Sequence, residues 1–124
     1  MATAKQVLTV AQSQIGYTEG KNNDNKYGKL FGANHQSWRA IFLWWCGNRA
    51  AIKHGSLNPI AKNASAAYIQ EETVRKGGRW ILKKTTSKKK KKNALASIKP
   101  GDLVSFDFGK KDAYRDHVGF VLKV

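Results

Sequence analysis

Two polar residues stand at the heads of apolar segments, where their side chains could do chemistry. Arg39 precedes the run Ala-Ile-Phe-Leu-Trp-Trp-Cys, and His117 precedes Val-Gly-Phe-Val. A helix start carries partial positive charge that stabilises an anion, and a histidine can accept a proton and return it. A nucleophile at the first position and a histidine at the second would suit acyl transfer. Arginine has no nucleophilic lone pair at neutral pH, so this chemistry cannot proceed through position 39.

The single cysteine, Cys46, is not expected to supply the missing nucleophile. It lies seven residues after Arg39, which is about 10 Å along a helix axis. Trp44 and Trp45 precede it directly, so we expect a buried thiol and a tryptophan pair that belongs to the core. One cysteine also excludes an intrachain disulfide.

Two helices are expected in the first half of the chain. Residues 3–15 carry apolar side chains at helical spacing, with Thr3 as the N-cap and Gly16 after the end. The stretch 16–37 is rich in turn-forming residues and is expected to be a loop. Ser37 is then expected to cap a second helix, which is apolar on most sides and therefore buried.

A third helix and a sheet are expected in the second half. The helix covers 63–77 and stops at Gly77–Gly78. Its inward-facing residues are expected to be Ala64, Ala67, Tyr68 and Val74. Strands are expected at 79–82, 102–108 and 117–124, separated by a basic stretch at 85–92, a Pro100–Gly101 turn and a polar loop at 109–116. Helices followed by strands predict an α+β fold with an antiparallel sheet.

The charge predicts an attraction to polyanions. There are 23 Lys and Arg against 8 Asp and Glu, a formal net charge of +15. Nucleic acid, anionic membranes and the anionic wall polymers of Gram-positive bacteria all fit such a field. The run Lys88–Lys92 is expected to be a solvated hairpin tip that adheres weakly to such polymers. No apolar stretch is long enough for a membrane span, and no signal-peptide layout is visible at the N-terminus.

Four motifs occur in order along the whole chain. They are Asn22–Gly28, Gln36–Cys46, Lys99–Phe108 and Asp116–Val121. Together they resemble the CHAP domains (cysteine/histidine-dependent amidohydrolase/peptidase) of phage endolysins, which have a papain-like α+β fold. The resemblance implies a single domain over 1–124 that acts on bacterial peptidoglycan as an amidase or endopeptidase.

The resemblance also implies roles for individual residues. Arg39 stands at the position of the catalytic nucleophile, and His117 takes the position of the general base. Gln36, Trp38 and Tyr27 would line the substrate groove beside the helix start. The chain ends soon after His117, so the last strands of the family's sheet, and with them the residue that orients the histidine, are expected to be missing.

No cofactor is expected. Some members of this family bind calcium in the loop that corresponds to residues 22–25. Asp24 is the only carboxylate there, and calcium loops usually need several, so a turn is favoured. His35 and His54 are expected at the surface, and no Cys/His cluster has zinc spacing.

Two functional hypotheses follow. The first is a peptidoglycan hydrolase domain of a phage lysin, monomeric, present in the host cytoplasm before lysis and then at the cell wall, and inactive in this form because Arg39 replaces the nucleophile. The second is a repurposed, non-catalytic binder of an anionic polymer, such as cell wall or nucleic acid, or of a protein partner. In that case Arg39 would contact the ligand.

Overall fold

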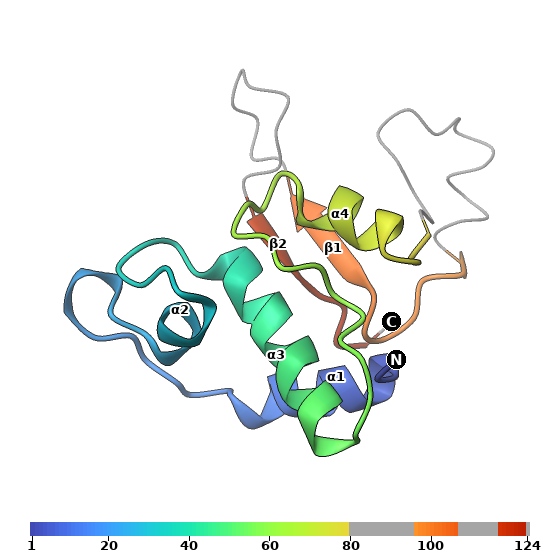
Figure 1. Cartoon of the computed structure of the whole chain (residues 1–124). Coiled ribbons are helices and arrows are strands. Elements are labelled where there is room, and N and C mark those ends of the chain that lie inside the picture. Colours follow the sequence, from blue (N-terminus) through green and yellow to red (C-terminus); the bar gives the residue numbers. More distant parts are fainter. Residues whose placement is uncertain (80–95, 107–116, 124) are drawn as a thin grey trace.

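The computed structural model describes residues 1–79, 96–106 and 117–123, in which helices surround a small sheet (Figure 1). The helices are α1 (Ala4–Ser13), η1 (Lys21–Asn23, a 3-10 turn), α2 (Lys26–Phe31), α3 (Arg39–Lys53) and α4 (Ile69–Arg75). The strands β1 (Leu103–Phe106) and β2 (His117–Phe120) pair antiparallel. The prediction of helices combined with an antiparallel sheet is therefore confirmed.

Helix α3 is the centre of this arrangement. It contacts α1, α2 and β2, and Figure 1 shows α2 on the far side of α3 from the sheet. Most of the fully buried side chains belong to α3, including Ile41, Leu43 and Cys46. The prediction of a helix buried on most sides is confirmed, and burial of this kind stabilises a fold by about 25 cal/mol for each Å² of apolar surface.

Helix α1 forms as its sequence predicts. The Thr3 side chain accepts a hydrogen bond from the Gln6 backbone N–H at 3.2 Å, and the Gln6 side chain accepts one from the Thr3 N–H at 2.9 Å. This reciprocal capping box satisfies two of the donors that a helix start leaves unpaired. The helix ends at Ser13, slightly earlier than expected, and Gly16 turns the chain with φ 97°.

The expectation of a plain loop over 16–37 is wrong, because α2 lies within it. Asn25 caps this helix by accepting a hydrogen bond from the Gly28 N–H at 2.7 Å. Gly32 ends it in the left-handed conformation, with φ 97°. An asparagine N-cap and a glycine after the last turn are the usual boundary signals of a short helix.

Helix α3 begins at Arg39, so the expected cap at Ser37 is wrong. Trp38 is the N-cap residue, and within the described part of the chain no side chain caps this end. The reason lies in the Trp38 ring, which packs against other aromatic rings and fixes where the chain turns into the helix. Ser37 remains exposed outside the first turn.

Helix α4 is shorter than the predicted 63–77. The Asn63 side chain accepts from the Ser65 N–H, and the Ser65 hydroxyl accepts from the Ala67 N–H. These local bonds hold the segment in turns and compete with helix formation. Tyr68, expected to face inward, is 44% exposed, whereas Ile69 is buried. The stop at Gly77–Gly78 agrees with the prediction, since Gly77 has φ 126°.

The two strands are joined in a register that pairs Phe106 with His117 and Leu103 with Phe120. Val118 is 3% exposed and belongs to the buried cluster. The Gly101 N–H donates to the Val121 carbonyl, and the Val121 N–H donates to the Asp102 carbonyl, so the pairing continues beyond β2. The expected strand at 79–82 lies outside the described residues except for Arg79, and the basic stretch 85–92 and the loop 109–116 lie outside them entirely.

The predicted Pro100–Gly101 turn is confirmed and contacts α1. Gly101 has φ 92°, and a Cβ added there would lie 2.8 Å from the Cβ of Ala4. The close approach and the left-handed backbone both require glycine at this position. The turn that opens β1 is thereby packed against the first turn of α1.

Candidate functional site

Each of the two residues predicted to be catalytic is the first residue of its element, and the two elements pack together. Arg39 is the first residue of α3, and His117 is the first residue of β2. Because α3 packs against β2, and both elements begin at the same end of that contact, the arrangement brings the helix start and the strand start to one side of the molecule (Figure 1). Arg39 is exposed and His117 is half-buried.

The strand alternation determines which face of the sheet His117 occupies. Successive side chains of a strand point to opposite faces, and Val118 is the side chain that the core buries. His117 therefore shares its face with Gly119. Among the described residues nothing lies within 4 Å of a Cβ added at Gly119. The His117 side chain therefore lies on the face of β2 opposite Val118, at the first residue of the strand.

The start of α3 is an electropositive end. Its first intrahelical bond runs from the Phe42 N–H to the Trp38 carbonyl at 2.8 Å, so the earlier amides lie outside the intrahelical ladder. No acidic residue lies in the first turn, and Arg39 adds a guanidinium. This end can attract a carboxylate or a phosphate. It cannot generate a thiolate, because it carries no thiol.

One hydrogen bond and three neighbouring rings hold the Trp38 side chain in place. The indole N–H donates to the Glu19 carboxylate at 2.5 Å. The ring packs against Tyr27 with 5.1 Å between centroids, and against Tyr17 and Phe42 at 6.1 and 6.0 Å. A half-buried ring held in this way can form a firm wall beside Arg39.

Tyr27, predicted to line the same groove, lies in the core. It is 1% exposed, and its hydroxyl donates to the Gln14 side chain at 3.1 Å. Burial raises the pKa of Tyr27 to about 12, with smaller contributions from Cys46 and Tyr17. Its ring supports Trp38 from the interior. A ligand at the surface would meet Trp38 and the exposed Gln36, whose amide donates to the Ala33 carbonyl at 3.3 Å.

The Asp24 loop is held together by its own side chains. An Asp24 carboxylate oxygen accepts from the Asn34 amide at 2.7 Å and lies 3.4 Å from the Lys29 ammonium. The Asn34 hydrogen bond, and then Lys29, lower the pKa of Asp24. A calcium ion does not fit these donors, because there is one carboxylate and a cation already occupies its oxygen. The described residues contain no group of three acidic, histidine or cysteine side chains that could hold a metal.

The prediction of a buried cysteine is confirmed. Cys46 is 0% exposed, and burial raises the pKa of its thiol to about 12. The thiolate is the reactive form of cysteine, so a thiol with this pKa is unreactive at neutral pH. The surface positions predicted for His35 and His54 are also confirmed, since both are exposed.

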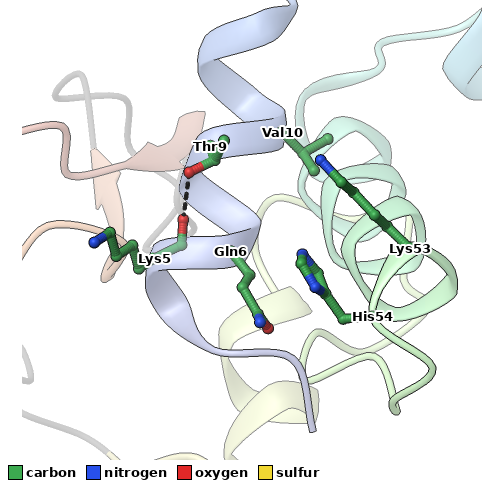
Figure 2. Close-up of a pocket in the computed structure, with 6 residues that line it drawn as sticks. All are labelled: Lys5, Gln6, Thr9, Val10, Lys53 and His54. Carbon is green, nitrogen blue, oxygen red and sulfur yellow. Dashed lines mark hydrogen bonds between the residues drawn. The ribbon is translucent and has the colours of Figure 1, made fainter.

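A depression of about 210 Å³ lies away from these residues, between α1 and the end of α3 (Figure 2). Its walls are Lys5, Gln6, Thr9, Val10, Lys53 and His54. None of the residues predicted for the site lines it. Figure 2 shows that the Thr9 hydroxyl turns back to the Lys5 carbonyl, a bond within α1 of 2.9 Å.

The sequence reasoning missed the aromatic support of the helix start. Tyr17, Tyr27 and Trp38 converge because α2 turns the intervening chain back onto α3. The caps at Asn25 and Gly32 were the available signal for that helix. The Glu19 contact with Trp38 had no signal in the sequence, since nothing in the spacing marks it.

Comparisons with known proteins add no relative. No family model, curated protein or solved structure matches this chain. Within the described residues no helix is both long and apolar enough to cross a membrane.

Proposed function

We propose that this chain is a cell-wall lysin domain of the CHAP type that binds peptidoglycan and does not hydrolyse it. The observation that carries the proposal is that α3 begins with arginine, that β2 begins with histidine, and that the two elements pack together. The four ordered motifs supply the link to wall-degrading enzymes.

The lack of hydrolysis follows from the chemistry of the site. The family's route needs a thiolate at the helix start. The bond that the thiolate attacks and the group that accepts the proton must both lie within its reach. Arg39 offers no lone pair, and Cys46 is buried within the helix with a raised pKa. His117 therefore has no nucleophile at position 39 to activate.

Binding without hydrolysis is supported by what Arg39 does offer. Its guanidinium is exposed at the positive end of a helix, beside the wall formed by Trp38. A guanidinium forms paired hydrogen bonds with a carboxylate, and peptidoglycan stem peptides carry carboxylates. This arrangement favours retention of the ligand at the place where the related enzymes would cut it.

The test restores the nucleophile. Arg39→Cys is expected to release dye from labelled Gram-positive cell walls, whereas the unaltered chain releases none. The new thiol should also have a pKa below the ordinary value of about 8.5, because the helix start stabilises the thiolate. Lys53→Cys is the matched control, since it also removes one positive charge and places an exposed thiol on the same helix away from its start.

The double variant Arg39→Cys/His117→Ala completes the test. It should lose the restored hydrolysis while retaining the wall binding of Arg39→Cys. An Arg39→Cys variant that folds but neither cleaves nor binds peptidoglycan would contradict the assignment. Cleavage that persists in the double variant would remove His117 from its role as the general base.

A further inference from the structure

Three exposed cations lie over aromatic rings on the side of the molecule formed by α2, α3 and the segment after it. The Lys26 ammonium is 4.8 Å from the centre of the Tyr17 ring and 5.3 Å from that of Trp45. The Arg49 guanidinium is 5.3 Å from the same Trp45 ring. The Lys62 ammonium is 5.2 Å from the ring centres of both Phe31 and Trp44. We call Lys26, Arg49 and Lys62 the cation–aromatic surface.

The rings connect these cations to one another through α3. Lys26 and Arg49 share Trp45, and Lys62 lies over its sequence neighbour Trp44. Helix α2 packs against α3, and its Phe31 ring meets the Trp44 ring edge-on, with 5.4 Å between the two centroids. The three charges are therefore mounted on one packed unit.

Acidic residues flank the stretch of sequence that carries this surface but do not lie within it, since Asp24 precedes it and Glu71 follows it. From Asn25 to Gln70 the chain has six Lys and Arg and no Asp or Glu. Among the described residues the ion pairs are Lys29 with Asp24 and Arg75 with Glu72, so neither pair neutralises the cation–aromatic surface. Its charge is available to an external anion.

The rings also restrict where the cations can go. A cation over an aromatic face is attracted to the electrons of the ring, and a lysine that is already ordered loses less side-chain entropy when it binds a ligand. Three cations held in this way present a fixed set of positions to successive anionic groups of a polymer.

The rings themselves are not available for stacking. Trp45 is 6% exposed and Tyr27 is 1% exposed. The rings of Tyr17, Phe31 and Trp44 are half-buried, and each of them lies beneath a cation. Proteins that hold single-stranded nucleic acid use exposed rings as platforms for bases. This surface favours an anionic polymer without bases.

We propose that the cation–aromatic surface binds the polyol-phosphate polymer of a Gram-positive cell wall through its phosphodiester groups. The choice of a wall polymer rests on the function proposed above. The surface would hold the domain on the wall independently of Arg39, so that the polymer and the peptidoglycan are bound by different residues.

The experiment compares two triple variants of the full chain with equal charge. Lys26→Gln/Arg49→Gln/Lys62→Gln removes the cation–aromatic surface. Lys5→Gln/Lys53→Gln/Lys76→Gln removes three exposed lysines elsewhere. Cosedimentation with purified walls is measured over a salt series, using intact walls and walls from which the phosphodiester polymer has been extracted with acid.

The first variant should lose at least about tenfold in affinity for intact walls at low salt, and the control less than about threefold. The salt slope should fall by about 2, since each lost phosphate contact contributes about 0.7 for a flexible polyanion. Both variants should bind extracted walls like the unaltered chain. Failure to bind extracted walls at all would contradict the proposed function instead, so the two failures are distinguishable.

Equal losses in the two variants would overturn the proposal, because general charge would then explain the binding. Competition by duplex DNA as effective as that by soluble wall polymer, at equal phosphate concentration, would also overturn it. Circular dichroism and thermal melting check that the triple variants fold. Should the first variant not fold, the single variants Lys26→Gln, Arg49→Gln and Lys62→Gln must each lower the affinity for intact walls.

Discussion

The two ends of α3 are built in different ways. At its start, Trp38 is held by a ring cluster and by Glu19, and the adjoining Arg39 puts a positive charge at the positive end of the helix dipole. At its end, Lys53 lies in the last turn and the His54 N–H bonds to the Ala50 carbonyl at 3.1 Å. Lys53 therefore suits its helix end electrostatically, whereas Arg39 does not.

The difference separates stability from binding capacity. The end of α3 is stabilised locally, by charge and backbone bonds. The start is stabilised by packing from distant parts of the chain, so its first turn can carry an unfavourable charge. Arg39 can therefore serve to bind a ligand, because the ring cluster around Trp38 offsets the unfavourable free energy of a positive charge at the helix start.

The largest expected contrast concerns isoleucines near the two ends. Ile41 is 0% exposed and Ile52 is 69% exposed. Ile41→Ala should lower the free energy of unfolding by about 2–5 kcal/mol, because it leaves a cavity in the core. Ile52→Ala should change it by less than about 0.5 kcal/mol. Urea unfolding followed by tryptophan fluorescence measures both, and equal losses would contradict the burial pattern of α3.

A second effect is a dependence of stability on pH, which arises from two buried groups, Cys46 in α3 and Tyr27 in α2. Burial raises the pKa of Cys46 from 9.0, and that of Tyr27 from 10.0, to about 12. The unfolded chain therefore loses these protons at lower pH than the folded chain. Their contribution to stability is complete below about pH 9 and is lost as the pH rises toward 12.

The measurement is the unfolding midpoint in urea between pH 8 and 11. Cys46→Ala should start from a lower stability but decline less steeply over this range. If the unfolding midpoint of this variant declined with pH as steeply as that of the unaltered chain, the Cys46 thiol would not contribute to the pH dependence of stability.

A smaller effect is expected from the hydrogen bond at the start of α3. Trp38→Phe keeps a ring in the cluster and removes the donor to Glu19. We expect a loss of about 1 kcal/mol in unfolding free energy. Glu19→Gln retains an acceptor and should lose less. A larger loss in Glu19→Gln than in Trp38→Phe would point to another role for the carboxylate.

The smallest effects test the dipole directly, using exposed residues just outside each end. Ser37→Asp adds a negative charge before the start and should stabilise the protein by about 0.3–1 kcal/mol. His54→Asp adds one after the end and should destabilise it by a similar amount. Both effects should shrink in 1 M salt, because the charges are screened. Changes of the same sign would contradict the comparison of the two ends.

How much of this the sequence predicts depends on whether the signal is local. The Thr3 cap, the Gly101 turn, the buried α3 and the buried Cys46 follow from neighbouring residues, and the structure confirms them. The starts of α3 and α4 do not. Trp38 responds to rings far away in the sequence, and the turns before α4 depend on side chains that compete with the helix.

The candidate site divides along the same line. The sequence pattern places His117 at the start of its strand, as the structure does, but it puts the cap of the helix that contains Arg39 at Ser37 instead of Trp38. It cannot distinguish a ring that lines a surface from one that supports it, and Tyr27 proved to be the supporting kind. That distinction depends on α2, whose packing against α3 decides which side of each ring meets solvent.

The contact between Gly101 and Ala4 has a consequence for synthesis of the protein. The first turn of α1 contacts the turn at Gly101, which is synthesised much later than α1. Loops of that length close late and slow the folding of small domains. Helix α1, although translated well before this turn, is therefore expected to complete its packing among the last of the described elements, and a nascent chain stopped before residue 101 would leave it open to proteases.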